Sequence, residues 1–141
     1  MTDVDKTQIF NAPIENIFKV LADYESYPEY MDGVKKVSVV STDGNKSVVE
    51  YDISIIKKFN YQLDLVAQEP TKVSWTFKSG DIFSKNTGSW TLKDLGDGTT
   101  EVNYKVEVDF KVKVPGMISK KLVSSNLPSL MKSVEKRAKN L

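Results

Sequence analysis

The chemistry open to this chain is limited by the residue types that it lacks. The sequence contains no Cys and no His, and Arg137 is its single Arg. The missing thiol and imidazole exclude Cys nucleophiles, zinc–sulfur sites, serine-protease-type triads and most transition-metal sites. A general acid or base must therefore be a carboxylate, a Lys or a Tyr. We predict no catalytic residue, no metal ion and no cofactor.

The carboxylates alternate with apolar residues, so we expect them to face solvent. This outward set consists of Glu50, Asp52, Asp64, Glu101, Glu107 and Asp109. Acid–base catalysis by carboxylates needs a pair whose surroundings separate the two pKa values, and the pattern contains no such buried pair. Tyr is the remaining candidate, but a phenol with an ordinary pKa of about 10 is a poor base without a cationic neighbour.

Three tyrosines, Tyr51, Tyr61 and Tyr104, occupy the apolar positions of an alternating pattern. A buried phenol needs a hydrogen-bond partner, which either the protein or a ligand supplies. On neighbouring strands, three such groups are able to orient a carbonyl or hydroxyl group inside an apolar pocket. The alternative, that all three are ordinary core residues, stays open.

Strands are predicted wherever apolar and polar residues alternate. These segments are residues 3–10, 37–39, 49–55, 59–65, 73–77, 88–92 and 102–112. Because the links between them are short, the pattern indicates an antiparallel meander. The side chains expected to point inward are Tyr51, Ile53, Tyr61, Leu63, Trp75, Phe77, Trp90, Tyr104, Val106 and Val108. Trp75 and Trp90 either form a stacking surface for a flat ligand or pack against each other as core.

Helices are expected at both ends of the chain. Asn11 is the predicted N-cap of a first helix, and residues 24–31 form a second helical piece or a turn, interrupted by Pro28. After Pro115-Gly116 the period changes to that of a long helix, with a kink expected at Pro128. Its apolar stripe is Val123, Leu127, Leu130, Val134, Ala138 and Leu141. We expect Val123, Asn126, Leu127 and Leu130 to complete the ligand-binding surface, although an N-cap role explains Asn126 equally well.

One end of the predicted meander is rich in lysine. The predicted lysine rim consists of Lys57, Lys58, Lys111, Lys113, Met117, Ile118, Lys120 and Lys121. Exposed apolar side chains such as Met117 and Ile118, surrounded by lysines, are suited to contact with an anionic membrane surface or with a protein partner. Lysines scattered over an ordinary surface are the alternative.

Length and composition restrict the class of protein. The chain has 141 residues, which fits one domain over residues 1–141, and it carries a formal net charge of +1. We therefore expect no nucleic-acid partner. The chain lacks an apolar run of about 18 residues that would span a membrane, and its acidic start is unlike a secretory signal. We expect a cytoplasmic protein, and its oligomeric state is not predicted.

Three segments resemble the START-like superfamily, in its polyketide cyclase/dehydrase and coenzyme Q-binding branch. The first segment is residues 12–31. The second runs from Val73-Ser74-Trp75 through Gly80-Asp81 to Gly88-Ser89-Trp90. The third is Asp97-Gly98-Thr99-Thr100, which leads into the last strand. The resemblance implies an α+β helix-grip fold. In that fold a seven-stranded antiparallel sheet curves around a long C-terminal helix, with two short helices between strands 1 and 2.

The same resemblance implies a hydrophobic small molecule, such as a lipid, quinone or polyketide-like aromatic, bound between sheet and helix. Two alternatives follow from other members of the group. One is an enzyme of the polyketide cyclase or aromatase type, which the missing His and the outward carboxylates disfavour. The other is an interaction module that associates with ribosomes or respiratory components.

Overall fold

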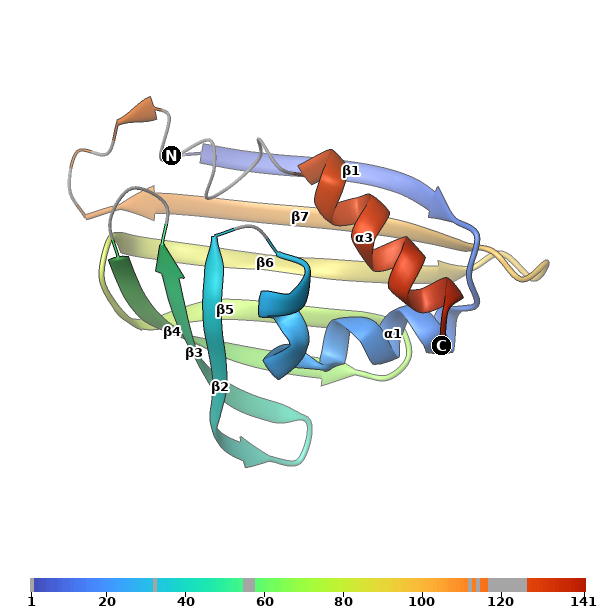
Figure 1. Ribbon diagram of the computed structural model, residues 1–141, viewed down its shortest axis with the longest axis horizontal. Coiled ribbons are helices and arrows are strands. Elements are labelled where there is room, and N and C mark those ends of the chain that lie inside the picture. The colour runs from blue at the N-terminus through green and yellow to red at the C-terminus, as the bar shows by residue number, and fades with distance from the viewer. Residues whose placement is uncertain (1, 32, 55–57, 112, 114, 117–126) are drawn as a thin grey trace.

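Seven antiparallel strands form one sheet in the order β1-β7-β6-β5-β4-β3-β2 (Figure 1). The computed structural model describes residues 2–31, 33–54, 58–111, 113, 115–116 and 127–141. The strands are β1 (Thr2–Phe10), β2 (Val34–Asp43), β3 (Lys46–Ser54), β4 (Lys58–Gln68), β5 (Lys72–Gly80), β6 (Phe83–Asp94) and β7 (Thr100–Phe110). All strands except β1 pair with their sequence neighbours, and β1 pairs with β7, so the predicted meander is confirmed.

Helices cover one face of this sheet, which we call the inner face. They are α1 (Ile14–Ala22), the 3-10 helix η1 (Tyr24–Glu29) and α3 (Leu127–Lys139). Figure 1 shows η1 in front of β2 and α3 crossing β1 and β7, while β2 and β3 run steeply across the direction of β1 and β7. The sheet therefore curves around the helices. This arrangement confirms the predicted helix-grip fold, including the two short helices between the first two strands.

The inner face and the helices share one buried core. Phe10, Ile17, Leu21, Val102 and Val134 are fully enclosed in it. Burial of these apolar side chains is the main force that holds helices against the sheet. A buried hydrogen bond adds a fixed point, because the Thr100 hydroxyl donates to the Ala12 carbonyl oxygen at 2.8 Å. It joins the start of β7 to the segment that leads into α1.

The start of α1 differs from the prediction. The N-cap is Pro13, whose side chain makes no capping hydrogen bond, so the assignment of Asn11 as N-cap was wrong. The Asn11 backbone N–H instead donates to Glu135 Oε2 at 2.7 Å. The Asn16 amide donates to the Ala138 carbonyl oxygen at 3.1 Å. These two bonds tie the first helical region directly to α3.

The described part of the C-terminal helix buries Leu127, Met131, Val134 and Ala138. Leu141 was predicted to belong to this stripe, but α3 ends at Lys139 and Leu141 is 62% exposed. Pro128 is the second residue of α3, but the segment before it, in which the kink was expected, lies outside the described residues, as do Val123 and Asn126. No helix in the described part of the chain is long and apolar enough to cross a bilayer.

Candidate functional site

Stacked tyrosines form the centre of the inner face. Tyr51 on β3 lies opposite Tyr61 on β4, and their rings stack with centroids 5.2 Å apart and an interplanar angle of 11°. The edge of Phe83 on β6 meets Tyr61 at 5.1 Å. From the helix layer, Tyr27 on η1 approaches Tyr51 at 6.4 Å. The result is a continuous aromatic surface built from η1 and three strands.

The hydroxyl groups of these tyrosines fall into two groups. Tyr27 is bonded, because its hydroxyl donates to the Leu21 carbonyl oxygen at 2.5 Å. The hydroxyls of Tyr51, Tyr61 and Tyr104 make no hydrogen bond to any residue that the structure describes, although Tyr51 is 6% exposed and Tyr61 is 8% exposed. The fully buried side-chain atom without a partner among the described residues is a different one, the Tyr30 hydroxyl on the C-terminal side of η1. The three sheet hydroxyls are not sealed in this way, and they leave hydrogen-bonding capacity on the inner face that the described residues do not use.

Burial keeps these phenols protonated. Desolvation raises the pKa of Tyr104 to about 12, and desolvation raises the pKa values of Tyr51 and Tyr61 further above the ordinary value. Burial disfavours the charged form, and a neighbouring tyrosine adds to the effect at each of the latter two. A group that holds its proton this tightly is a hydrogen-bond donor at neutral pH and a weak base.

A second aromatic cluster surrounds Tyr104. Trp90 on β6 lies opposite Tyr104 on β7, with ring centroids 4.6 Å apart. Trp75 on β5 approaches the same phenol at 6.1 Å. Both predicted Trp residues therefore contact Tyr104, and the choice between core packing and a stacking surface for ligand stays open.

A polar residue missed by the sequence analysis belongs to this cluster. Asn86 on β6 is only 7% exposed, and its Oδ1 accepts a hydrogen bond from Trp75 Nε1 at 3.0 Å. The signal was present in the sequence: residues 86, 88, 90 and 92 keep the same two-residue period, but the predicted strand began at Gly88. The inner face therefore carries a buried amide in addition to its phenols.

Gly88 provides the space in which the Trp75 ring lies. It pairs with Trp75 on one side and with Val106 on the other. A Cβ at this position would lie 2.5 Å from Trp75 Cζ2 and 2.4 Å from the Lys105 carbonyl oxygen. Real Cβ atoms do not approach other atoms this closely, so β6 or its neighbours must shift to accommodate any side chain.

We expect Gly88→Ala to lower the free energy of unfolding by about 1–3 kcal/mol, the usual cost of overpacking. Urea unfolding followed by circular dichroism measures this loss. Gly116→Ala is the matched control, because an added Cβ there meets nothing within 4 Å. A Gly88→Ala variant as stable as the control would contradict the close packing described for Trp75.

The structure brings most predicted site residues together in the core between the inner face of the sheet and α3. Ile53, Leu63, Val106, Val108 and Leu127 are buried there, and Phe77 and Leu130 are half-buried against the same core. Val123 and Asn126 lie outside the described residues. The set thus combines a buried aliphatic floor with partly accessible aromatic rings.

The outer face carries Glu50, Asp52 and Glu107, each of which has a polar partner there. Asp52 accepts a hydrogen bond from Asn60, Glu50 accepts one from Gln62 at 3.3 Å, and Glu107 pairs with Lys85 at 3.0 Å. Among the described residues no group of three acidic side chains is placed to hold a metal ion. These residues therefore offer no acid–base pair to the inner face.

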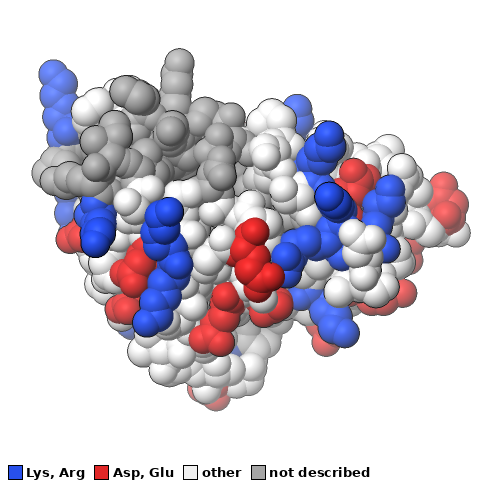
Figure 2. All heavy atoms as spheres, in the orientation of Figure 1, with Lys and Arg blue, Asp and Glu red and all other residues white. Residues whose placement is uncertain are grey.

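The predicted lysine rim is only partly described. Lys58, Lys111 and Lys113 are exposed, and the Lys111 ammonium donates to the Gly80 carbonyl oxygen at 2.7 Å. Lys57, Met117, Ile118, Lys120 and Lys121 lie outside the described residues. Figure 2 shows Lys and Arg interspersed with Asp and Glu over the face that carries α1 and α3. Membrane contact stays a prediction.

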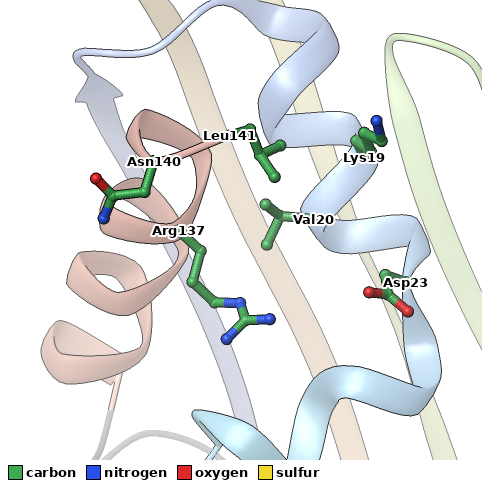
Figure 3. A pocket seen from close by; sticks show the side chains of 6 residues that line it. All are labelled: Lys19, Val20, Asp23, Arg137, Asn140 and Leu141. Carbon is green, nitrogen blue, oxygen red and sulfur yellow. The ribbon is translucent and has the colours of Figure 1, made fainter.

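A separate pocket of about 480 Å³ opens between the C-terminal ends of α1 and α3. Figure 3 shows Lys19, Val20 and Asp23 on one side and Arg137, Asn140 and Leu141 on the other. Arg137 is engaged elsewhere, since it pairs with Glu29 at 3.4 Å and its guanidinium lies 4.8 Å from the Tyr30 ring centre. The lining is largely exposed and charged, unlike the inner face.

Comparisons with known proteins agree with this geometry. A family model described as polyketide cyclase / dehydrase and lipid transport matches residues 10–135. A comparison with curated protein sequences finds no match. A START superfamily protein from Mycobacterium smegmatis is 25% identical, with a TM-score of 0.82 over 98% of this chain and 97% of its own.

Two further solved structures share the fold at lower identity. The Zhui aromatase/cyclase from a Streptomyces species has a TM-score of 0.84 at 15% identity, over 99% of this chain and 94% of its own. The STAR-related lipid transfer protein from Xanthomonas axonopodis has a TM-score of 0.77 at 14% identity, over 97% and 85%. At these identities the likeness establishes the fold alone.

Proposed function

Because this chain belongs to the polyketide cyclase / dehydrase and lipid transport family, we propose that it binds a hydrophobic small molecule on the aromatic inner face of its sheet. The ligand classes that we propose are lipids, quinones and polyketide-like aromatics. Binding takes place in the cytoplasm, and the ligand exchanges at the lysine-bearing end of the sheet, against an anionic membrane.

The observation that carries this proposal is the state of the inner-face tyrosines. The hydroxyls of Tyr51, Tyr61 and Tyr104 have no protein partner among the described residues, in a surface whose other buried polar side chains are Asn86 and Thr100. Sites for small molecules are mostly apolar, with a few polar groups that fix orientation. A ligand oxygen beside these hydroxyls would satisfy groups that the described protein leaves without a partner.

The driving force is removal of apolar ligand surface from water, at roughly 25 cal/mol for each Å² buried. The phenols add orientation, since each donates one hydrogen bond in a fixed direction. The raised pKa values weigh against a Tyr acting as general base in a cyclase-type reaction. Binding without catalysis is therefore the function that this geometry supports best.

Native mass spectrometry of the protein as purified from cells tests this proposal, because an apolar mass bound to the folded chain is expected. Uptake from a panel of a quinone, a fatty acid and a polyketide-like aromatic should also quench Trp fluorescence. We expect the double substitution Tyr51→Phe/Tyr61→Phe to weaken binding of an oxygen-bearing ligand about tenfold, which corresponds to loss of roughly one net hydrogen bond.

Thr91→Val is the control, because it removes a hydroxyl group from an exposed position of β6, away from the aromatic surface. It should leave the affinity unchanged. A protein that carries no mass from cells and takes up none of the panel would overturn the proposed function.

A further inference from the structure

Apart from the tyrosines, Asn86 is the buried polar side chain on the described inner face whose N–H groups have no hydrogen-bond acceptor. Among the described residues, only Asn86 and Thr100 are buried polar or charged side chains outside the tyrosines. The Thr100 hydroxyl is committed to the Ala12 carbonyl oxygen. Asn86 faces the same side of the sheet as its pairing partner Val108 and as Trp90, which lies four residues further along β6.

Trp75 determines which way the Asn86 amide points. An indole N–H is only a donor, so the atom that it meets at 3.0 Å must be the amide oxygen. The amide nitrogen is therefore turned away from Trp75. Its two N–H groups donate to no residue that the structure describes. Asn86 as a residue is only 7% exposed, but its amide nitrogen is not among the fully buried atoms without a partner, so the nitrogen is accessible to a ligand oxygen.

The surroundings of Asn86 define the acceptor that would suit it. The Trp75 indole contacts Asn86 directly, and the Trp75 ring continues into the aromatic cluster through Tyr104 at 6.1 Å, which in turn meets Trp90 at 4.6 Å. No Lys or Arg among the described residues is buried, so a carboxylate or phosphate of a ligand would lack a counter-ion on this face. A neutral oxygen on a flat or apolar skeleton fits both conditions.

We propose that Asn86, oriented by Trp75, is the hydrogen-bond donor through which this protein selects a ligand that carries a neutral carbonyl oxygen over the same skeleton without it. The inference rests on the proposed function and adds to it a specificity-determining residue. Trp75 is a positioning residue in this scheme, because it holds the amide in the orientation that presents the N–H groups.

A matched pair of flat compounds tests the inference. Fluorenone and fluorene have the same tricyclic skeleton and differ in a carbonyl against a methylene group. We expect the wild-type protein to bind fluorenone about tenfold more tightly, as measured by quenching of Trp fluorescence or by calorimetry. A site that offers a hydrogen bond to a ligand oxygen disfavours the compound that lacks this oxygen.

Three variants separate the role of Asn86 from general packing. Asn86→Leu keeps the side-chain size and removes the donor, so the preference should fall to about one while fluorene still binds. Trp75→Phe keeps Asn86 but releases its amide to turn, and the preference should fall in the same direction. Asn103→Leu changes an Asn on β7 that bonds Asp5 and Thr7 on the outer face, and it should retain the full preference.

The outcomes distinguish this inference from the proposed function. Equal affinity of the wild type for the two compounds, or a full preference in Asn86→Leu, would overturn the role of Asn86 and leave ligand binding intact. Binding of neither compound by a protein that does bind the wider ligand panel would also overturn it. Failure of the whole panel would overturn both. Thermal unfolding of each variant shows that the fold is retained during these measurements.

Discussion

Raising the pH above about 10 is expected to unfold this protein cooperatively, with the transition complete by about pH 12. The cause is the set of buried tyrosines. Desolvation raises the pKa values of Tyr27, Tyr51 and Tyr61 well above the ordinary value, and it raises the pKa of Tyr104 to about 12. The described residues place no cation beside these four phenols that would lower their pKa values.

The sign of the effect follows from proton binding. Tyrosines of the unfolded chain lose their protons near pH 10, whereas those of the folded protein keep them to higher pH. Between these values the unfolded state binds fewer protons, so the free energy of unfolding falls as the pH rises. Below pH 10 both states are protonated and the tyrosines cause no pH dependence.

The size of the effect is large because four groups act together. Each contributes at most about 1.4 kcal/mol for each pH unit above its unfolded pKa. Together they contribute about 5 kcal/mol per unit, and a domain is typically stable by about 5–15 kcal/mol. One to two pH units therefore suffice to remove most of the stability.

Circular dichroism and tyrosinate absorbance, recorded on the same samples, check this expectation. The two curves should coincide, because the buried tyrosines ionise when the fold is lost. Tyr51→Phe/Tyr61→Phe removes two of the four groups, so it should halve the steepness and move unfolding to higher pH. Tyrosines that all ionise near pH 10 while the circular dichroism stays native would contradict the burial described here.

The sheet was largely predictable because apolar and polar residues alternate along each strand, and this alternation decides which side chains face the core. Tyr51 and Tyr61 were expected on one face, and they pair directly across β3 and β4. A slip of one residue in either strand would have moved every apolar side chain to solvent. Local sequence thus determined both the strands and their inward side chains.

Contacts between distant segments were not predictable in the same way. Asn11 has a residue type suited to an N-cap, but the helix begins after Pro13 and the Asn11 N–H bonds to Glu135, 124 residues away. Asn86 was missed for a related reason: its role depends on a hydrogen bond from Trp75 on the neighbouring strand. Such pairings depend on the folded arrangement and not on local spacing.

Phe83 illustrates a third limit, which is irregular strand pairing. Continuing the inward positions 86, 88 and 90 backwards by twos would place Ser84 inside and Phe83 outside. The register between β6 and β7 shifts between Phe83 and Lys85, and such a bulge places one extra residue in the strand. Ser84 is therefore exposed and Phe83 is 2% exposed. Alternation alone gives the wrong face for this residue.

We expect Phe83→Ala to lower the free energy of unfolding by about 3–5 kcal/mol. The ring is enclosed by three others: Tyr61 at 5.1 Å, Phe110 at 5.5 Å and Phe77 at 6.2 Å between centroids. Its removal leaves a cavity and also removes an edge-on partner of the stacked tyrosines. Urea unfolding should show a midpoint lower by about 2 M, given a slope of about 2 kcal/mol per M.

Phe110→Ala is the matched control for this prediction. It deletes the same ring from a half-buried position that touches Phe83, so the loss should be half as large or less. If Phe83→Ala is too unstable to measure, Phe83→Leu deletes fewer atoms and should still cost about 1 kcal/mol or more. Equal losses at the two positions would mean that the bulge in β6 does not turn Phe83 into the core. The tyrosine surface would then lack the support that its proposed role in binding requires.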